Sequence, residues 1–585
     1  MKAAFVFPSL PSARVALFLA AFAFSAALAL PACPQALRIS SLRGAPGGHL
    51  SASLRAEPRT LNPVFATDSA SRTVTSILNA DLLHINRATD AVEPALASSW
   101  QVGRDGQSYL LHLRHGVRFS DGSPFTADDV LFSFRVYLDP KLNAPQRDLL
   151  IIDGRPIRVT RLGPDLVRFD LPRPYAAAAR LFDGIAILPS HLLQPLLQAG
   201  TLANAWTLVT PPAQLVGLGP FRLRSYRPGQ SLVLERNPYY WKQDAGSRPL
   251  PYLDEVDFSF ASNQDAEAIR FTAGQLDLIS RLTADTYSSL QKLSSSNLIR
   301  ELDGGPGLEF DLLLFNLNAD LAAHLPQAAH TQTWFLQQPF RQALSLAVDR
   351  AALVHLVFQD HAVPLASPVT PASGQWANPA LRPTALDLPS ARRLLADAGF
   401  RWRGAALYDR DGNPVRFTII ATSSNRAQSG IATLLAHNFA ALGIDASVVP
   451  LEFRSFLQRI TQSHDYDLAV MALSAGDTDP NGNMSLWLSS GNLHLWNQGE
   501  AQPATPWEAE IDSLMRQQMT LTDFRQRRAA YFRIQSIYAA QLPFLSLVSP
   551  NMLGAVRSPL AGAAPGPLDP GMLDNIASFY WRKGP

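Results

Sequence analysis

The chain has 585 residues, of which 47% are hydrophobic and 17% are charged, a composition typical of a globular protein. Its 50 basic and 48 acidic groups leave a net charge of +2, which argues against nucleic acid or an anionic membrane surface as a partner. The length exceeds that of a single hydrophobic core, so we expect about two or three sub-domains.

The first 33 residues have the pattern of an export signal. Lys2 and Arg14 precede an uncharged run over residues 15–30, which is shorter than the roughly 20 residues of a usual membrane span. The single cysteine, Cys33, follows a Leu-Pro-Ala sequence. This sequence resembles a lipoprotein cleavage site except at the proline, so lipidation of Cys33 and ordinary cleavage nearby both stay open. With one cysteine, no intramolecular disulfide can form.

The residues that follow predict a tether and the first elements of the fold. Ser, Gly and Pro are frequent within residues 34–48, as in a flexible tether. Apolar residues alternate over residues 49–55, which predicts a strand. A Thr-Leu-Asn-Pro loop then leads to a helix predicted over residues 69–83.

Residues 96–139 predict a hairpin, a turn and a capped helix. Tyr109, Leu111 and Leu113 fall on one face of a strand that follows an Asp-Gly turn. After a second turn, Thr126 is placed to cap a helix whose first turn holds two aspartates, where the helix dipole favours negative charge.

The same region also matches a pattern of residues at fixed spacing, namely Trp100, Asp105, Gly106, Tyr109, Leu113, Arg114, Gly116, Val117, Phe119, Asp121, Gly122, Pro124, Ala127, Asp128, Asp129 and Val130. This pattern resembles the signature of family 5 extracellular solute-binding proteins. They are the large receptors of ABC importers for peptides, nickel and some sugars. The alternative is an ordinary hairpin before a capped helix.

A pair of glycines farther along, Gly217 and Gly219, is compatible with a phosphate loop. Pro220 and a strand follow them, however, so the sequence offers no helix N-terminus to hold a phosphate. We therefore interpret the glycines as a tight turn into strands at residues 222–226 and 231–235. The Gly-Pro-Phe, Arg-Asn-Pro-Tyr-Tyr-Trp and Leu-Pro-Tyr-Leu-Asp sequences of this region also resemble the family, in which they are mostly scaffold.

Two patterns predict the second part of the fold. Residues 308–318 have a mainly apolar sequence with a continuous apolar run over 312–315, which favours a strand buried on both faces of a largely parallel sheet. Residues 415–421, 429–442 and 446–451 follow in strand, helix, strand order, which implies parallel pairing.

The predicted strand over residues 468–473 ends in small and acidic residues, including Ser474, Gly476 and Asp477. Open α/β folds bind ligands at the carboxyl ends of their strands. In the peptide-binding relatives that this chain resembles, an aspartate at this strand end pairs with the α-ammonium group of the ligand. The resemblance gives that role to Asp477, although its spacing to Asp479 differs by one residue. The alternative is an Asx turn without a ligand, which we favour for Asp479.

Other candidate ligand neighbours come from the same resemblance. Asn62 and Phe65 follow the Thr-Leu-Asn-Pro sequence, which lies at the mouth of the cleft in the family, and Asn316 ends the apolar strand at 308–318. A surface turn is the alternative for Asn62 and Phe65.

Trp487 and Trp496 are candidates for lining side-chain pockets, with ordinary core packing as the alternative. His494 lies between them. The 12 histidines are scattered and show no paired-ligand spacing, so we expect no metal site and no cofactor.

The resemblance covers residues 50–581 and implies an α/β fold of two lobes around a cleft, with an extra inserted sub-domain. Helices are predicted at residues 506–519 and 523–541, and a strand at 543–548. The expected division is a signal over 1–33, a tether over 34–48, lobe I over 49–90, 216–300 and 536–585, an inserted sub-domain over 91–215, and lobe II over 301–535.

The function that the resemblance implies is the substrate-binding subunit of an ABC importer. We expect a periplasmic or lipid-anchored monomer, not an enzyme, that closes on a peptide and delivers it to permease subunits in the inner membrane. Nickel-chelate or oligosaccharide binding and a chemosensory or chaperone role are the alternatives on the same fold. An exported hydrolase is disfavoured because the sequence contains neither a Gly-x-Ser-x-Gly elbow nor a metal-protease motif.

Overall fold

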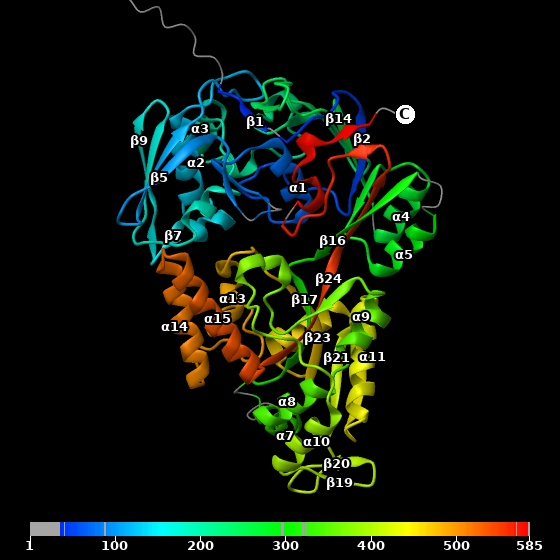
Figure 1. Ribbon diagram of the computed structural model, residues 1–585. Helices are drawn as coiled ribbons and strands as arrows, with labels where there is room; N and C mark the ends of the chain where they lie inside the picture. Colours follow the sequence, from blue (N-terminus) through cyan, green and yellow to red (C-terminus); the bar gives the residue numbers. More distant parts are fainter. Residues whose placement is uncertain are drawn as a thin grey trace, which may run out of the picture.

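The computed structural model describes most of the chain after residue 34 (Figure 1). The described residues are 35–39, 41–86, 89, 91–261, 263–293, 298–318, 321, 325–568 and 570–582. The predicted signal and Cys33 lie outside them. Among the helices of the described residues, none combines the length and the apolar character needed to cross a membrane.

The chain forms an upper and a lower lobe, and strand β24 (Phe544–Arg557) runs from the lower lobe into the upper one (Figure 1). The sequence predicts this strand only over residues 543–548, because Pro550 and Asn551 are residues that commonly end strands. Antiparallel partners carry the ladder past both residues, so the predicted end is wrong. These partners are β15 (Leu278–Ser280) and β16 (Ile299–Pro306).

The upper lobe is built on a sheet in the order β11 (Phe221–Arg227), β12 (Ser231–Arg236), β14 (Glu255–Phe260) and β2 (His49–Leu54). Leu50, Ala52 and Leu54 are buried on β2, which confirms the predicted strand. Its smaller strands are β1 (Leu37–Ile39), β13 (Lys242–Asp244), β3 (Leu83–Ile85), β4 (Val92–Pro94), β25 (Leu560–Ala561) and β26 (Tyr580–Trp581). Its helices are α1 (Ser69–Leu78), α4 (Gln264–Thr272) and α5 (Ala284–Leu293).

A second sheet belongs to a side unit of the upper lobe, drawn in cyan on the left of Figure 1. Its order is β5 (Ala97–Val102), β6 (Ser108–Leu113), β10 (Leu166–Asp170) and β9 (Arg158–Gly163). The other elements of the unit are α2 (Ala127–Leu138), α3 (Ser190–Gln198), β7 (Ile151–Ile152) and β8 (Arg155–Pro156). Tyr109, Leu111 and Leu113 are buried on β6, and Thr126 caps α2 in a capping box with Asp129. The predicted hairpin and capped helix are therefore confirmed.

The lower lobe is built on a sheet in which β24 is followed by β17 (Glu309–Phe315), β23 (Leu468–Ser474), β21 (Arg416–Thr422) and β22 (Asp445–Leu451). β21 and β22 are parallel and are joined by α11 (Arg426–Ala440), as the sequence predicts. β17 is buried on both faces, but it is antiparallel to both β23 and β24. The expectation of parallel pairing is wrong here, because a strand covered on both faces needs an apolar sequence whatever direction its neighbours take.

Helices cover both faces of this sheet and form two cores. The first face carries α7 (Pro326–Phe335), α8 (Gln338–Ala347), α9 (Arg350–Phe358), α10 (Leu388–Asp397) and α11. The second carries α12 (Phe453–Gln458), α13 (Met484–Trp487), α14 (Pro506–Thr520) and α15 (Phe524–Gln541). The remaining strands are β18 (Ala362–Pro364), which pairs with β24, and the hairpin of β19 (Arg401–Arg403) and β20 (Ala406–Tyr408). The two helices predicted after residue 505 are thus confirmed.

Gly219 allows the start of β11 to lie against the end of α1. A Cβ on this glycine would lie 2.2 Å from the carbonyl oxygen of Ile77, and backbone atoms cannot move aside. We expect Gly219→Ala to lower the free energy of unfolding by about 1–3 kcal/mol, measured by urea unfolding. The control is Gly163→Ala, whose Cβ would meet only Leu166 Cβ at 3.6 Å. Equal losses in the two variants would contradict a specific role for this close approach.

Candidate functional site

A large cavity lies between the two lobes, with a volume of ≈ 2030 Å³. Sites for small molecules usually measure about 300–1,000 Å³, so this cavity has room for a larger ligand. Its wall comes from the upper lobe, the side unit and the lower lobe, with residues drawn mainly from segments 148–153, 175–183, 280–286, 307–309, 424–430, 474–484 and 550–553.

The end of β23 brings three predicted site residues into this wall. β23 is buried until Met471, and after Ser474 the chain leaves the sheet through small residues. Ser474, Gly476 and Asp477 all line the cavity. The structure thus brings these three residues together at the carboxyl end of a central strand, as the sequence predicts for their position.

Arg180 holds the Asp477 carboxylate across the cavity. Its Nε donates to Oδ2 at 2.9 Å and its Nη2 donates to Oδ1 at 2.5 Å. Nη2 also donates to the Thr478 hydroxyl at 2.7 Å. The two ion-paired side chains keep 11% and 27% of their exposure, so the pair is partly buried but still reached by water. Asp477 is therefore both a cavity-wall carboxylate and the partner of a cation on the opposite side.

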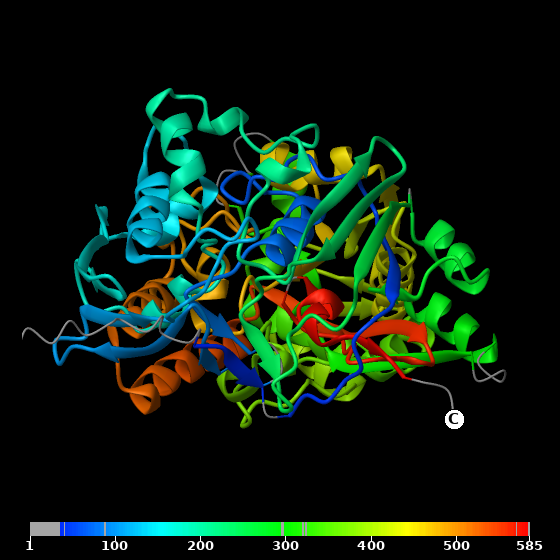
Figure 2. The same cartoon turned by 90° about the horizontal axis from the view of Figure 1, so that it is seen from above.

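The segment that carries Arg180 docks on the lower lobe at further points. The Asn481 amide donates to the Tyr175 hydroxyl at 2.8 Å, and the Ala176 N–H donates to the Met519 carbonyl at 2.7 Å. Both views place the cyan side unit beside the orange segment of α14 and α15 (Figure 1 and Figure 2). The lobes thus touch through a polar contact on one side of the cavity.

Sequence reasoning did not find Arg180. It lies 297 residues before Asp477, on the 3-10 helix Ala178–Phe182, and its local sequence shows no signal for a binding site. Only the docking of the side unit on the lower lobe makes the two side chains neighbours.

Asp479 also lines the cavity, but its carboxylate is bonded within the protein, including the Asx turn favoured from the sequence. Its Oδ1 accepts from the Asn481 N–H at 3.0 Å in an Asx turn. Both carboxylate oxygens also accept from Arg527, at 2.6 and 2.7 Å. The side chains of this ion pair are 4% and 6% exposed. The pair fixes the loop after β23 to helix α15.

Asn62 and Phe65 lie away from the cavity wall, within the part of the chain that the structure describes. The Asn62 amide donates to the carbonyls of Leu202 and Ala205, each at 3.3 Å. Phe65 packs against the core of the upper lobe. Both side chains hold the loop to neighbouring segments, and the expectation that they border the ligand stays a prediction.

Asn316, Trp487 and Trp496 are also absent from the wall formed by the described residues. The Asn316 amide donates to two backbone carbonyls of the loop before β23, at 2.7 and 2.8 Å. The Trp487 indole donates to the Tyr531 hydroxyl at 3.3 Å, and the Trp496 indole donates to Glu508 at 3.0 Å. The two tryptophans are buried, as in the alternative of core packing. Asn316 anchors a loop, and a ligand contact for it stays a prediction.

Carboxyl groups outnumber guanidinium groups along the cavity wall. The acidic residues are Asp148, Asp153, Asp183, Asp265, Asp285, Glu309, Asp477 and Asp479, and the arginines are Arg55, Arg72, Arg180, Arg281 and Arg426. Burial raises the pKa of Glu309, while Arg281 opposes the shift. Burial, together with the charge of Glu309, raises the pKa of Asp311 well above its usual range. Glu309 lines the cavity and Asp311 does not, so a positive group on a ligand would favour the ionised form of Glu309.

Comparison with known proteins identifies the family of this chain. Residues 91–494 match the family described as bacterial extracellular solute-binding proteins, family 5. The chain belongs to this family. It is similar to the oligopeptide-binding protein AppA of Bacillus subtilis, with 24% identity over 88% of this chain and 89% of AppA. It is also similar to a dipeptide-binding protein of Pseudomonas aeruginosa, with 26% identity over 89% and 93% of the two chains.

Solved structures of the family have the same two-lobed fold. The AppA structure from Bacillus subtilis in complex with a nonapeptide superimposes with a TM-score of 0.67 at 24% identity, over 92% of this chain and 100% of that one. The ABC transporter substrate-binding protein CtaP of Listeria monocytogenes gives a TM-score of 0.75 at 23% identity, with the same coverage. The predicted α/β fold with two lobes is therefore confirmed.

Proposed function

We propose that this protein binds peptides in the cavity between its lobes and delivers them to the permease of an ABC importer. The observation that carries the proposal is the position of Asp477, whose carboxylate lies in the cavity wall at the end of β23. The relatives named for binding oligopeptides and dipeptides support the choice of ligand. The chain acts as an exported receptor rather than as an enzyme, and Cys33 stays the predicted lipidation site.

Asp477 suits the capture of a peptide's free amino terminus. An α-ammonium group donates charge-assisted hydrogen bonds to a carboxylate, and these are stronger than bonds between neutral groups. Ser474 and Gly476 lie beside Asp477 in the wall, and their small size leaves the peptide backbone room to approach. Because every unmodified peptide has an amino terminus, this contact gives affinity without selecting a side chain.

The guanidinium of Arg180 donates hydrogen bonds to both oxygens of the Asp477 carboxylate in the structure. An incoming ammonium group must therefore replace the guanidinium or share the oxygens with it. The exchange keeps the charge of Asp477 compensated before and after binding, so no buried carboxylate is left unpaired at any stage.

The proposal is tested with matched pairs of peptides, one free and one acetylated at its amino terminus. We expect free peptides to raise the melting temperature of the purified protein. Acetylated peptides are expected to bind about 10–150-fold more weakly, because they lose a hydrogen bond between charged groups worth about 1.5–3 kcal/mol. Affinities are measured by isothermal titration calorimetry.

Two results would contradict the proposal. Equal affinity for free and acetylated peptides would remove the proposed role of Asp477. Stabilisation by nickel chelates or oligosaccharides and by no peptide would assign the cavity to another ligand class.

A further inference from the structure

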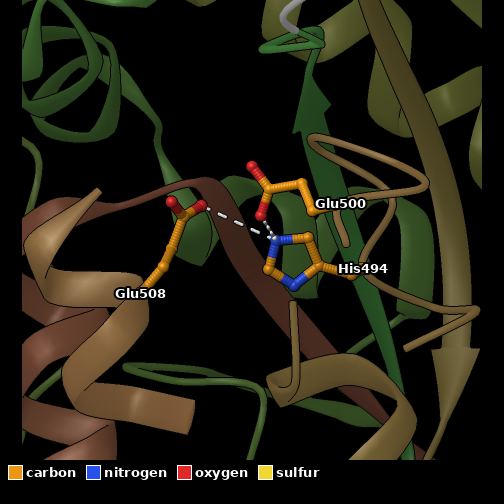
Figure 3. A group of neighbouring side chains, drawn as sticks. All are labelled: His494, Glu500 and Glu508. Atoms are coloured by element: carbon orange, nitrogen blue, oxygen red, sulfur yellow. Dashed lines mark ion pairs between the residues drawn. The ribbon is translucent and has the colours of Figure 1, made fainter. Parts of the chain in front are cut away.

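Three side chains outside the cavity converge in the lower lobe, and Figure 3 shows them around one ring nitrogen. Nε2 of His494 lies 3.5 Å from Oε2 of Glu500 and 3.6 Å from Oε1 of Glu508. The ligand atoms offered by the three residues all lie within 4.8 Å of one another. The cluster joins the loop after α13 to the first turn of α14.

The spacing of these atoms fits the coordination of a small divalent cation. Zinc binds imidazole nitrogen and carboxylate oxygen at about 2.0–2.2 Å in tetrahedral sites, which places neighbouring ligand atoms about 3.3–3.5 Å apart. The two distances from His494 are already close to that separation. The three residues would supply three of the four ligands of such a site.

The cluster also contains buried polar atoms that the described residues leave without hydrogen bonds. These atoms are both ring nitrogens of His494 and Oε2 of Glu500. The His494 side chain is 0% exposed and that of Glu500 is 6% exposed. Burying such atoms without partners is costly. Nε2 of His494 and Oε2 of Glu500 face each other, which indicates that something binds between them.

Surrounding groups hold Glu508 in place and leave one of its oxygens turned toward the histidine. Its Oε2 accepts from the Thr505 N–H at 3.0 Å and from the Thr505 hydroxyl at 2.7 Å. Its Oε1 accepts from the Trp496 indole at 3.0 Å, and the His494 ring packs on Trp496 with centroids 3.7 Å apart. Metal ligands are oriented by outer hydrogen bonds of this kind.

The charges of the cluster point to a divalent cation rather than to a proton. Two carboxylates and a neutral imidazole carry two negative charges, which one divalent ion balances. A protonated His494 balances only one of them. The carboxylate of nearby Asp512 is already bonded to Arg516 at 2.8 Å.

We propose that His494, Glu500 and Glu508 form a structural site for a divalent cation of the zinc class. The ion fastens the loop after α13 to helix α14, and a water or the buried Ser489 hydroxyl completes its coordination. This proposal runs against the expectation from the sequence that the chain holds no metal. It is independent of the peptide cavity, because none of the three residues lines it.

The test is metal binding by the whole purified protein after treatment with a chelator. We expect one Zn²⁺ per chain to bind with saturation in calorimetry and to raise the melting temperature. Co²⁺ as a probe is expected to give the visible absorption of a tetrahedral complex. Glu500→Gln keeps the size of the side chain and is expected to weaken zinc binding at least about tenfold. His494→Gln is expected to abolish the cobalt absorption.

The matched control is Glu510→Gln, on an exposed face of α14 where Glu510 pairs with Arg533. This variant is expected to bind zinc like the parent protein. The proposal is overturned if the parent protein shows no saturable site. It is also overturned if Glu500→Gln and Glu510→Gln bind zinc equally, a comparison that stands even if His494→Gln does not fold.

Discussion

Asp479→Ala is expected to lower the free energy of unfolding of the lower lobe by about 3–5 kcal/mol, since it removes one partner of a buried ion pair. Arg527 directs two of its nitrogens at the two oxygens of Asp479, at 2.6 and 2.7 Å. Its Nε donates to the Gln518 side chain at 2.9 Å, and its guanidinium lies 4.9 Å from the centroid of the Trp376 ring. None of these remaining contacts supplies a compensating negative charge.

The measurement for this prediction is urea unfolding followed by tryptophan fluorescence, to which Trp376 beside the ion pair contributes as one of 10 tryptophans. Glu510→Ala is the control, because its pair with Arg533 is largely exposed, at 43% and 57%. Exposed pairs contribute little, so we expect a much smaller change. Similar losses in the two variants would contradict the structural role of Asp479.

A double replacement separates the lost charge from the lost packing. Asp479→Leu combined with Arg527→Met removes both charges at once. We expect the double variant to recover most of the stability that Asp479→Ala loses, since apolar side chains often replace a buried ion pair without penalty. If the double variant is the less stable one, the hydrogen bonds of the loop matter more than the charges.

Asp477→Asn is expected to weaken the binding of free peptides about 10–150-fold and to abolish the preference for free over acetylated ones. The asparagine keeps the shape of the side chain, but it loses the charge that attracts the α-ammonium group. Calorimetry with matched peptides measures both effects. A variant that still prefers free peptides would show that another carboxylate of the wall holds the amino terminus.

Arg180→Met is the companion variant, and its expected effect has the opposite sign. Removing the guanidinium frees the Asp477 carboxylate, so we expect free peptides to bind about fivefold more tightly, as suits a partly exposed ion pair. Weaker binding would contradict competition between Arg180 and the ligand. It would instead mean that the guanidinium contributes to the peptide-bound state.

Local structure was the part of this fold that the sequence predicted well. The capping box at Thr126 and the alternation on β6 depend on residues a few positions apart, and both are confirmed. The direction of β17 was missed, because an apolar sequence reports burial but not the direction of the neighbours. The extent of β24 was missed because its partner strands, rather than its own residues, carry it past Pro550.

The candidate site was predictable only where one segment carries it. Ser474, Gly476 and Asp477 follow one strand and reach the cavity together. Arg180 comes from another unit, and His494, Glu500 and Glu508 lack a spacing that any metal motif shares. Trp487 and Trp496 are of a residue type that often lines pockets, but they are buried in the core. Aromatic residues near a sheet edge can either line a pocket or pack in the core, so the sequence alone does not distinguish the two.

The continuity of β24 limits how the lobes can move. The strand pairs with β17 and β18 in the lower lobe and with β16 and β15 in the upper one, so one continuous strand takes part in the ladders of both lobes. Its pairing is irregular between Asp303 and Pro306 and between Asp311 and Leu312. We therefore expect the lobes to close on a ligand by rotating about those two irregular points of the shared sheet. Because the shared strand stays hydrogen-bonded on both sides of these points, we expect the lobes to return to one relative orientation once the ligand leaves.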